Sequence, residues 1–209
     1  RHLLAVRTAG GATEIVRAHA DSGSITVLVP AEPGIAWSFP APSPDGRFVA
    51  AARHRDGRSF DLVLLDPKTG RLLQEVTSDR AVDTSPTWSP DGHFLLWSSD
   101  RSGIPNVFAV AIDAQGRLGP IKQVTHVVTG VAYPSVDPEM RWIYLAGYHA
   151  NGWAVERVPF DPSRWFEPLP LAPVYAEAAP PDPAPAPPTA PARARSEEHT
   201  SELQSRGLI

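Results

Sequence analysis

The sequence predicts an all-β protein, a β-propeller fragment of about four four-stranded antiparallel blades. The first observation is a repeat whose copies begin at Pro40, Pro86 and Pro134, with steps of 86 − 40 = 46 and 134 − 86 = 48 residues. This period is typical of propeller blades or solenoid units. The second observation is that short apolar runs alternate with turn residues inside each copy. No stretch has helical apolar spacing over three turns, which excludes a helical repeat.

Each copy begins with a proline-containing strand and a turn. The first reads Pro40-Ala-Pro-Ser-Pro-Asp-Gly46, and the second ends on Ser-Pro-Asp-Gly92. Proline presets φ, aspartate bonds its own backbone, and glycine accepts a positive φ, so these residues build a turn. In the third copy Glu139 and Met140 replace Asp and Gly, so the turn motif is incomplete there. The predicted structural turn residues are Pro44, Asp45, Gly46, Pro90, Asp91 and Gly92.

In the central copy three apolar runs follow the turn, at Phe94–Ser98, Val107–Ile112 and Ile121–Val124. They are too short for helices and rich in residues that favour strands. Turn residues separate them at Asp100–Gly103 and Asp113–Gly116. With the proline-containing first strand, this pattern predicts four antiparallel strands in each unit.

The neighbouring copies have matching runs. An earlier, partial unit is indicated by Thr13–Val16, which fits the third-strand position of Phe60–Val63 because 60 − 13 = 47. The chain is therefore expected to hold about four blades, and four-stranded sheets repeated radially make a β-propeller. The matching runs are Phe48–Ala52, Asp61–Leu65 and Arg71–Val76 before the central copy, and Trp142–Leu145 and Ala154–Val158 after it.

The central copy resembles the PD40 (WD40-like) repeat of the TolB propeller, through Trp88-Ser-Pro-Asp-Gly92, Ser99-Asp-Arg-Ser-Gly103 and Asn106-Val-Phe-Ala-Val110. The resemblance covers roughly Thr8 to Trp165. The same repeat occurs in the propellers of the tricorn and prolyl oligopeptidase or dipeptidyl peptidase IV families. Its motif is specific for the fold and not for a function, because its Pro, Asp and Gly build a turn and contact no ligand.

The sequence divides into three parts. Residues 1–167 are predicted to form the partial propeller, and residues 168–194 a disordered Pro/Ala-rich linker, since Pro168 to Pro191 holds ten of the chain's 24 prolines. Residues 195–209 are interpreted as a non-native tail, because Arg195–Ser205 resembles a translated sequencing adapter. The chain begins at Arg1 without Met, so native sequence is expected to be missing at both ends and a signal peptide is not observable.

Composition narrows the class of function. A net charge of −4 and 42% hydrophobic content predict a soluble, globular chain that binds no nucleic acid. No window of 18 apolar residues exists, which predicts no helical membrane span. The absence of cysteine excludes disulfides, a thiol nucleophile and a cysteine zinc site.

No catalytic constellation is found in the sequence. There is no Gly-x-Ser-x-Gly elbow, no close pair of histidine ligands and no phosphate loop. Asp45 and Asp91 are single carboxylates in turns, whereas general acid–base chemistry needs converging groups. The sequence therefore predicts a protein that is not an enzyme and has no cofactor and no metal.

A propeller usually binds through the face where the loops from second to third strand meet the loops that lead to the next blade. The guanidinium groups of arginines in these loops would bind carboxylates of a protein or peptide partner through paired hydrogen bonds. The alternative is that these charged loop tips are simply solvated. The predicted binding residues are Arg55, Arg58, Arg80, Asp83, Arg101 and His149.

Three functions follow as hypotheses. The first is a non-catalytic, protein- or peptide-binding scaffold of the bacterial cell envelope. The TolB resemblance implies a periplasmic location and association with Tol-Pal proteins. The second is the gating propeller of a serine peptidase whose catalytic domain is missing. The third is the propeller module of a multidomain outer-membrane protein. In each case an interrupted ring leaves unpaired edge strands.

Overall fold

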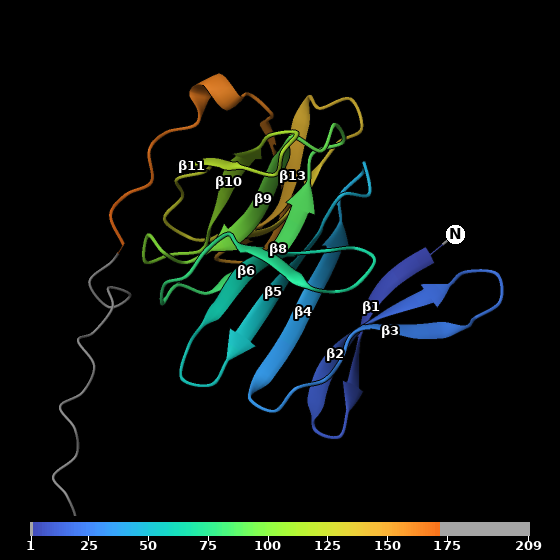
Figure 1. The fold of residues 1–209 in the computed structure, drawn as a ribbon. Coiled ribbons are helices and arrows are strands. Elements are labelled where there is room, and N and C mark those ends of the chain that lie inside the picture. Colours follow the sequence, from blue (N-terminus) through green and yellow to red (C-terminus); the bar gives the residue numbers. More distant parts are fainter. Residues whose placement is uncertain (1, 172–209) are drawn as a thin grey trace, which may run out of the picture. The chain divides into compact units, whose positions relative to one another are not determined.

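The computed structural model of the protein describes residues 2–171, which form four antiparallel β-sheets and one short 3₁₀ helix, Pro162–Arg164 (Figure 1). This confirms the all-β propeller fragment predicted from the repeats, with one sheet for each copy. Residues 172–194 of the predicted linker and the predicted tail at 195–209 lie outside the described residues.

The sheets follow one another along the chain, and strands that are adjacent in sequence are adjacent in each sheet. Sheet 1 contains β1 (His2–Ala9), β2 (Ala12–His19) and β3 (Ile25–Val29). Sheet 2 contains β4 (Ile35–Pro42), β5 (Val49–Arg55), β6 (Phe60–Leu65) and β7 (Leu72–Glu75). Sheet 3 contains β8 (Asp83–Trp88), β9 (Phe94–Ser99), β10 (Asn106–Ile112) and β11 (Leu118–Gln123). Sheet 4 contains β12 (Val131–Val136), β13 (Trp142–His149) and β14 (Gly152–Pro159).

The turn after the first strand has a recurring geometry. Asp45 accepts hydrogen bonds from the backbone N–H of Arg47, at 3.0 Å, and from the hydroxyl of Ser43, at 2.7 Å. Gly46 has a φ of +70°. These are the contacts that the turn interpretation requires. The second copy repeats them through Ser89, Asp91, His93 and Gly92.

The third copy keeps this turn with different residues. Asp137 stands where the other copies have serine, and its Oδ1 accepts from the backbone N–H groups of Arg141 and Trp142, at 2.6 and 2.7 Å. Met140 occupies the glycine position at a φ of +54°. One carboxylate thus replaces the Ser and Asp pair, while methionine is held in a conformation that favours glycine.

We expect Met140→Gly to raise the free energy of unfolding by about 0.5–1 kcal/mol. A side chain in the left-handed region costs about 1–2 kcal/mol, and the greater freedom of glycine in the unfolded chain offsets part of the gain. Urea denaturation of the full chain measures the change. Met140→Ala keeps the strain and is the control, so an equal gain from both variants would contradict this explanation.

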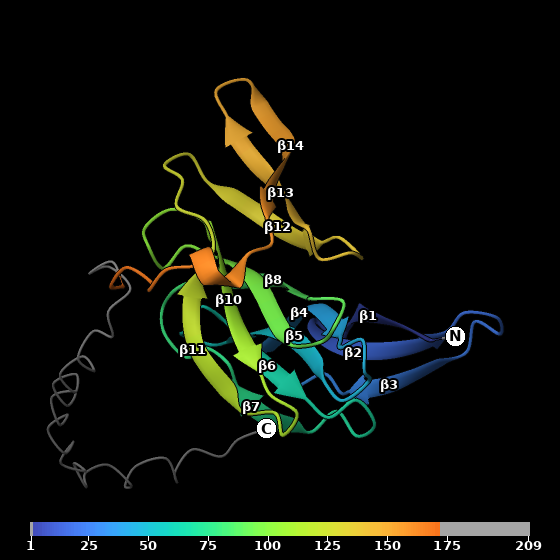
Figure 2. The ribbon, with the colours of Figure 1, turned by 90° about the horizontal axis from the view of Figure 1, so that it is seen from above.

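The first strands of sheets 2, 3 and 4 each contain a bulge. Phe39, Ser85 and Tyr133 have φ values of 51°, 55° and 57°, and the register of each strand shifts at that point. Each of the three residues precedes a proline of the repeat. β4 packs against β8, and β8 against β12, so the bulges lie on the inner strands of the array (Figure 2).

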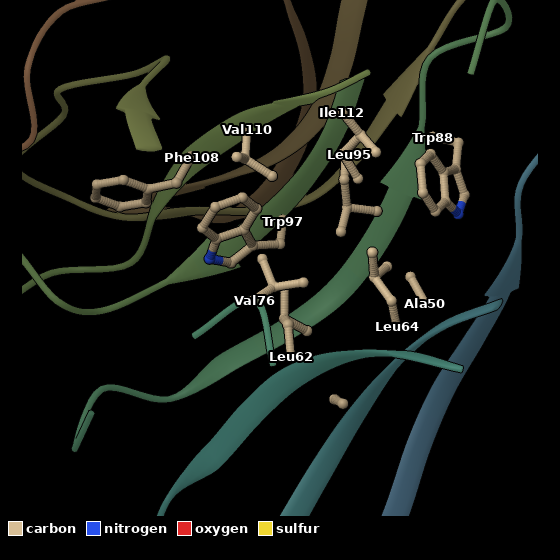
Figure 3. Packing of buried hydrophobic residues seen from close by; sticks show 11 residues of the cluster. Ala50, Leu62, Leu64, Val76, Trp88, Leu95, Trp97, Phe108, Val110 and Ile112 are labelled. Atoms are coloured by element: carbon tan, nitrogen blue, oxygen red, sulfur yellow. The ribbon is translucent and has the colours of Figure 1, made fainter. Parts of the chain in front are cut away.

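The hydrophobic core lies in three clusters, each between two successive sheets. The cluster between sheets 2 and 3 is built around Trp97 and Phe108, both fully buried (Figure 3). Trp88 packs parallel to Phe48 at 6.2 Å between ring centroids, and its indole N–H donates to the carbonyl of Ala41 at 3.0 Å. Each sheet therefore depends on its neighbour for burial of its faces.

The turn between third and fourth strands of a blade contacts the preceding blade. The guanidinium of Arg47 donates to the carbonyls of Asp113 and Ala114, at 3.1 and 2.7 Å, and Gly116 lies against the ring of Phe48. Between sheets 1 and 2 the guanidinium of Arg17 donates to the carbonyl of Pro67. These turns connect each sheet to the one before it.

Within residues 2–171, sheet 4 has three strands, because the chain leaves this sheet after the turn that follows the third strand. That turn begins at Asp161. The equivalent turns of sheets 2 and 3 begin at Asp66 and Asp113, so the three aspartates are separated by steps of 47 and 48 residues. Its flanks, Phe160 and Trp165, pack edge-on against Phe94 of sheet 3, with ring centroids 5.8 and 5.2 Å apart.

The next residues, which we call the crossing segment (165–169), run to sheet 3 and not along β14. The backbone N–H of Phe166 donates to the carbonyl of Gln123 at 3.1 Å, and the reverse bond is 2.9 Å long. Lys122 and Glu167 form an ion pair beside it. The residues that directly follow this turn therefore pair with β11 and not with β14.

Candidate binding face

The loops from second to third strand and the loops that lead to the next sheet lie at the same end of the sheets, because antiparallel strands alternate in direction. We call this end the loop face. Its loops are residues 10–11, 30–34, 56–59, 76–82, 100–105, 124–130 and 150–151.

Two predicted binding residues, Asp83 and Arg101, form a buried ion pair. The Arg101 guanidinium lies 3.0 Å from Oδ2 of Asp83, and the two residues are 6% and 0% exposed. The indole N–H of Trp97 donates to Oδ1 of Asp83 at 3.0 Å, and the guanidinium stacks over Phe108, 5.3 Å from the ring centroid. The structure therefore brings these two residues together beneath the loop face, where their charged groups form an ion pair with each other.

Burial raises the pKa of the Asp83 carboxyl, while the charge of Arg101 and hydrogen bonds from Ser99 and Thr77 act in the opposite direction. A buried carboxylate without such partners costs several kcal/mol. The ion pair thus holds β8 to the loop after β9.

The pair belongs to a larger network that joins sheets 2 and 3. Arg101 also reaches Asp79, at 3.3 Å, and the backbone N–H of Asp79 donates to Asp61 at 3.2 Å. Arg55, a third predicted binding residue, lies 3.5 Å from Asp61 and 3.4 Å from Glu75. Asp61 is fully buried, which raises the pKa of its carboxyl.

Sequence reasoning missed Asp61 and Asp79. The available signal was the aspartate inside the apolar run Phe60–Leu65, since a charged residue in a buried strand requires a partner. The identity of that partner depends on which loops contact each other in the folded protein, and the residues next to Asp61 in the sequence do not indicate this.

Arg58 and Arg80 lie on the surface of the loop face, both exposed. The hydroxyl of Ser59 donates to the carbonyl of Arg80 at 2.7 Å, which brings the two loops together. Within residues 2–171 neither arginine forms a side-chain ion pair within 4 Å. His149, the last predicted residue, lies on sheet 4, where its Nε2 is 2.5 Å from Glu156.

A groove of about 560 Å³ opens on the loop face between sheets 1 and 2. Thr13 at its base accepts from the backbone N–H of Trp37 at 2.6 Å, and the backbone N–H of Asp56 donates to the carbonyl of Gly34 at 2.9 Å. The sequence analysis did not predict this groove, for which the available signal was the pair of glycines Gly10 and Gly11. Lining residues include Gly10, Gly11, Thr13, Pro33, His54 and Asp56.

Small residues, one carboxylate and one imidazole line this groove, so it offers backbone and side-chain hydrogen bonds to an extended chain. Residues 2–171 contain no group of three or more His, Asp or Glu arranged to hold a metal ion. In the same residues, no helix is long and apolar enough to cross a membrane.

The sequence matches the TolB β-propeller domain family, PD40, over residues 5–158. The chain belongs to this family. The match confirms the PD40 resemblance of the repeats. The crystal structure of TolB from Acinetobacter baumannii has the same fold, with a TM-score of 0.65 at 20% identity over 76% of this chain and 38% of that chain.

Two curated relatives match parts of this TolB-type propeller. The Tol-Pal system protein TolB of Syntrophus aciditrophicus is 38% identical over 65 residues, 30% of this chain and 14% of the relative. Tricorn protease homolog 1 of Streptomyces coelicolor is 33% identical over 85 residues, 41% of this chain and 7% of the relative. The chain thus spans a minor part of the length of each.

Proposed function

We propose that this propeller is a non-catalytic scaffold of the bacterial cell envelope that binds a protein or peptide through its loop face. The observation that carries the proposal is the juxtaposition, on one face, of a groove and two exposed arginines, Arg58 and Arg80. Membership of the TolB family supports it, because a relative is named as a protein of the Tol-Pal system. We place the protein in the periplasm on the same ground.

The chemistry of the face favours an extended, acidic partner. Arginine guanidinium groups bind carboxylates through paired hydrogen bonds, and Arg58 and Arg80 are not used in ion pairs within residues 2–171. The groove adds backbone groups at Gly10 and Gly11 that an extended chain can use. The remaining predicted arginines, Arg55 and Arg101, form ion pairs beneath the loop face, with Glu75 and Asp83 respectively.

A second candidate function is the gating propeller of a peptidase, favoured by the match to tricorn protease homolog 1. In that case the loop face would admit peptides to a catalytic domain elsewhere in the protein. Both functions use the same face for extended chains, and they differ in what happens to the peptide afterwards.

The test measures binding of a fluorescent peptide of alternating acidic and apolar residues to the full chain. Charge reversal of Arg58 and Arg80 to Glu is expected to weaken binding by about tenfold or more, since each charged hydrogen bond contributes about 1.5–3 kcal/mol. The matched control reverses Arg117 and Arg141, which are 78% and 69% exposed on the opposite face, and is expected to bind normally.

Equal loss in both double variants, or no binding by the unmodified chain, would contradict the loop-face proposal. Mass spectrometry of the recovered peptide gives the second readout. An intact peptide is expected, and cleavage by the purified chain would contradict the non-catalytic role.

A further inference from the structure

The outer edge of β14 is open among the described residues. Sheets 2 and 3 end on fourth strands, β7 and β11, whereas sheet 4 ends on its third strand, β14 (Figure 2). The crossing segment (165–169), which follows the turn at Asp161, pairs with Gln123 of β11 instead. The chain described here thus supplies no strand to this edge.

The register fixes which backbone groups of β14 point outward. The N–H of Phe160 donates to the carbonyl of Arg141 at 3.0 Å, and the pairing continues through Ile143 opposite Val158. Hydrogen-bonded and non-hydrogen-bonded pairs alternate along an antiparallel ladder. The outward donors and acceptors therefore belong to alternate residues of β14, namely Trp153, Val155 and Arg157.

The side chains of these three residues lie on one face of the edge strand. Val155 is 83% exposed and Trp153 is 61% exposed. The guanidinium of Arg157 lies over the ring of Trp142, 4.2 Å from its centroid. An exposed apolar edge strand is a template for pairing with another chain.

We propose that β14 of a second copy of this chain pairs antiparallel with this edge, about a two-fold axis at Val155. The sequence of the edge is self-complementary, because Val155 then faces Val155 of the partner subunit. Trp153 faces Arg157 of the partner subunit, and Arg157 faces Trp153 of the partner subunit. These are β-branched and cation–π cross-strand pairs in an isologous contact.

Only this register uses all three outward residues. A shift that sets Val155 opposite Arg157 of the partner subunit places Trp153 opposite Pro159 of the partner subunit, which has no N–H. The opposite shift, with Trp153 facing Val155 of the partner subunit, moves Arg157 beyond β14 onto the turn residue Asn151 of the partner subunit. Arg157 and Trp153 lie two residues on either side of Val155, so the edge of β14 is complementary to itself. This complementarity favours a second copy of the chain as the partner of this edge.

Cysteine cross-linking tests the two-fold axis directly, since the chain contains no cysteine. Hydrogen-bonded residues across antiparallel strands have Cα atoms about 5.5 Å apart, within the range of a disulfide. Under mild oxidation of the full chain, Val155→Cys is expected to form a disulfide-linked dimer about tenfold faster than Val128→Cys. The control position is 79% exposed on the loop face, so equal rates would overturn the proposal.

A backbone substitution gives an independent measurement. Val155→Pro removes an outward N–H and leaves the ladder with β13 intact, so the fold is retained as in natural edge strands. Sedimentation equilibrium is expected to show dimerisation weakened about tenfold or more in Val155→Pro, and unchanged in Val155→Thr. A monomeric unmodified chain, or an equally tight dimer of Val155→Pro, would overturn the proposal. Blocking of the cross-link by an unrelated extended peptide would overturn it in favour of a partner protein.

Discussion

Arg101→Ala is expected to lower the free energy of unfolding by about 3–5 kcal/mol. The substitution leaves the carboxylate of Asp83 fully buried without its counter-ion, and breaking one half of a buried pair is far more costly than losing an exposed pair. It also removes the contact with Asp79 and the stacking over Phe108. Interactions within sheet 3, and between sheet 3 and the loop that joins it to sheet 2, are therefore lost together.

Urea denaturation of the full chain, followed by tryptophan fluorescence, measures this effect. Arg80→Ala is the matched control, because Arg80 lies exposed on a neighbouring loop and its loss is expected to change stability by less than about 0.5 kcal/mol. The double variant Asp83→Ala with Arg101→Ala is expected to lose less than the sum of the single variants. A loss below about 1 kcal/mol for Arg101→Ala would show that the ion pair is not a determinant of the fold.

Gly70→Ala is expected to cost about 3 kcal/mol, for two reasons that act together. Gly70 has a φ of +71°, where a side chain costs about 1–2 kcal/mol. A Cβ atom here would also lie 2.9 Å from the carbonyl carbon of Leu28 and closer still to its oxygen, so β3 or the turn must move. Overpacking of this kind adds about 1–3 kcal/mol.

Gly57→Ala separates the two contributions. Gly57 has a similar φ, +75°, but nothing lies within 4 Å of its Cβ position. It is expected to lose only the conformational part, about 1 kcal/mol, in the same denaturation experiment. Equal losses at Gly57 and Gly70 would show that contact between sheets 1 and 2 contributes nothing at this turn.

The repeat allowed most of the fold to be predicted, because the signals that define a blade are local. Short apolar runs and turn residues at fixed spacing predicted the strands of sheet 3 almost to the residue; β11 begins at Leu118, three residues before the run at Ile121. The turn at Asp137 shows the limit of such signals. Its residues differ from the other copies, yet Asp137 supplies the same hydrogen bonds and Met140 tolerates the glycine conformation.

Features that depend on distant residues could not be predicted. Arg101 follows a strand in a polar turn, and only the structure shows that Asp83, from another strand, accepts its charge. The route of the crossing segment depends on Gln123 and Phe94, which are more than 40 residues away in sequence. The positive φ values at Phe39 and Tyr133 oppose the preferences of those residue types, so no propensity indicates them.

The turns that reach back to the preceding sheet have a consequence for biosynthesis. Phe48 of sheet 2 is covered by Gly116 of sheet 3, and Phe94 of sheet 3 by Trp165, each more than 60 residues later in the sequence. On the ribosome, we therefore expect a newly emerged blade to keep an aromatic face exposed until the third strand and turn of the next blade have been translated. Each blade completes the burial of the one before it, so we expect the array to fold in order from the amino terminus.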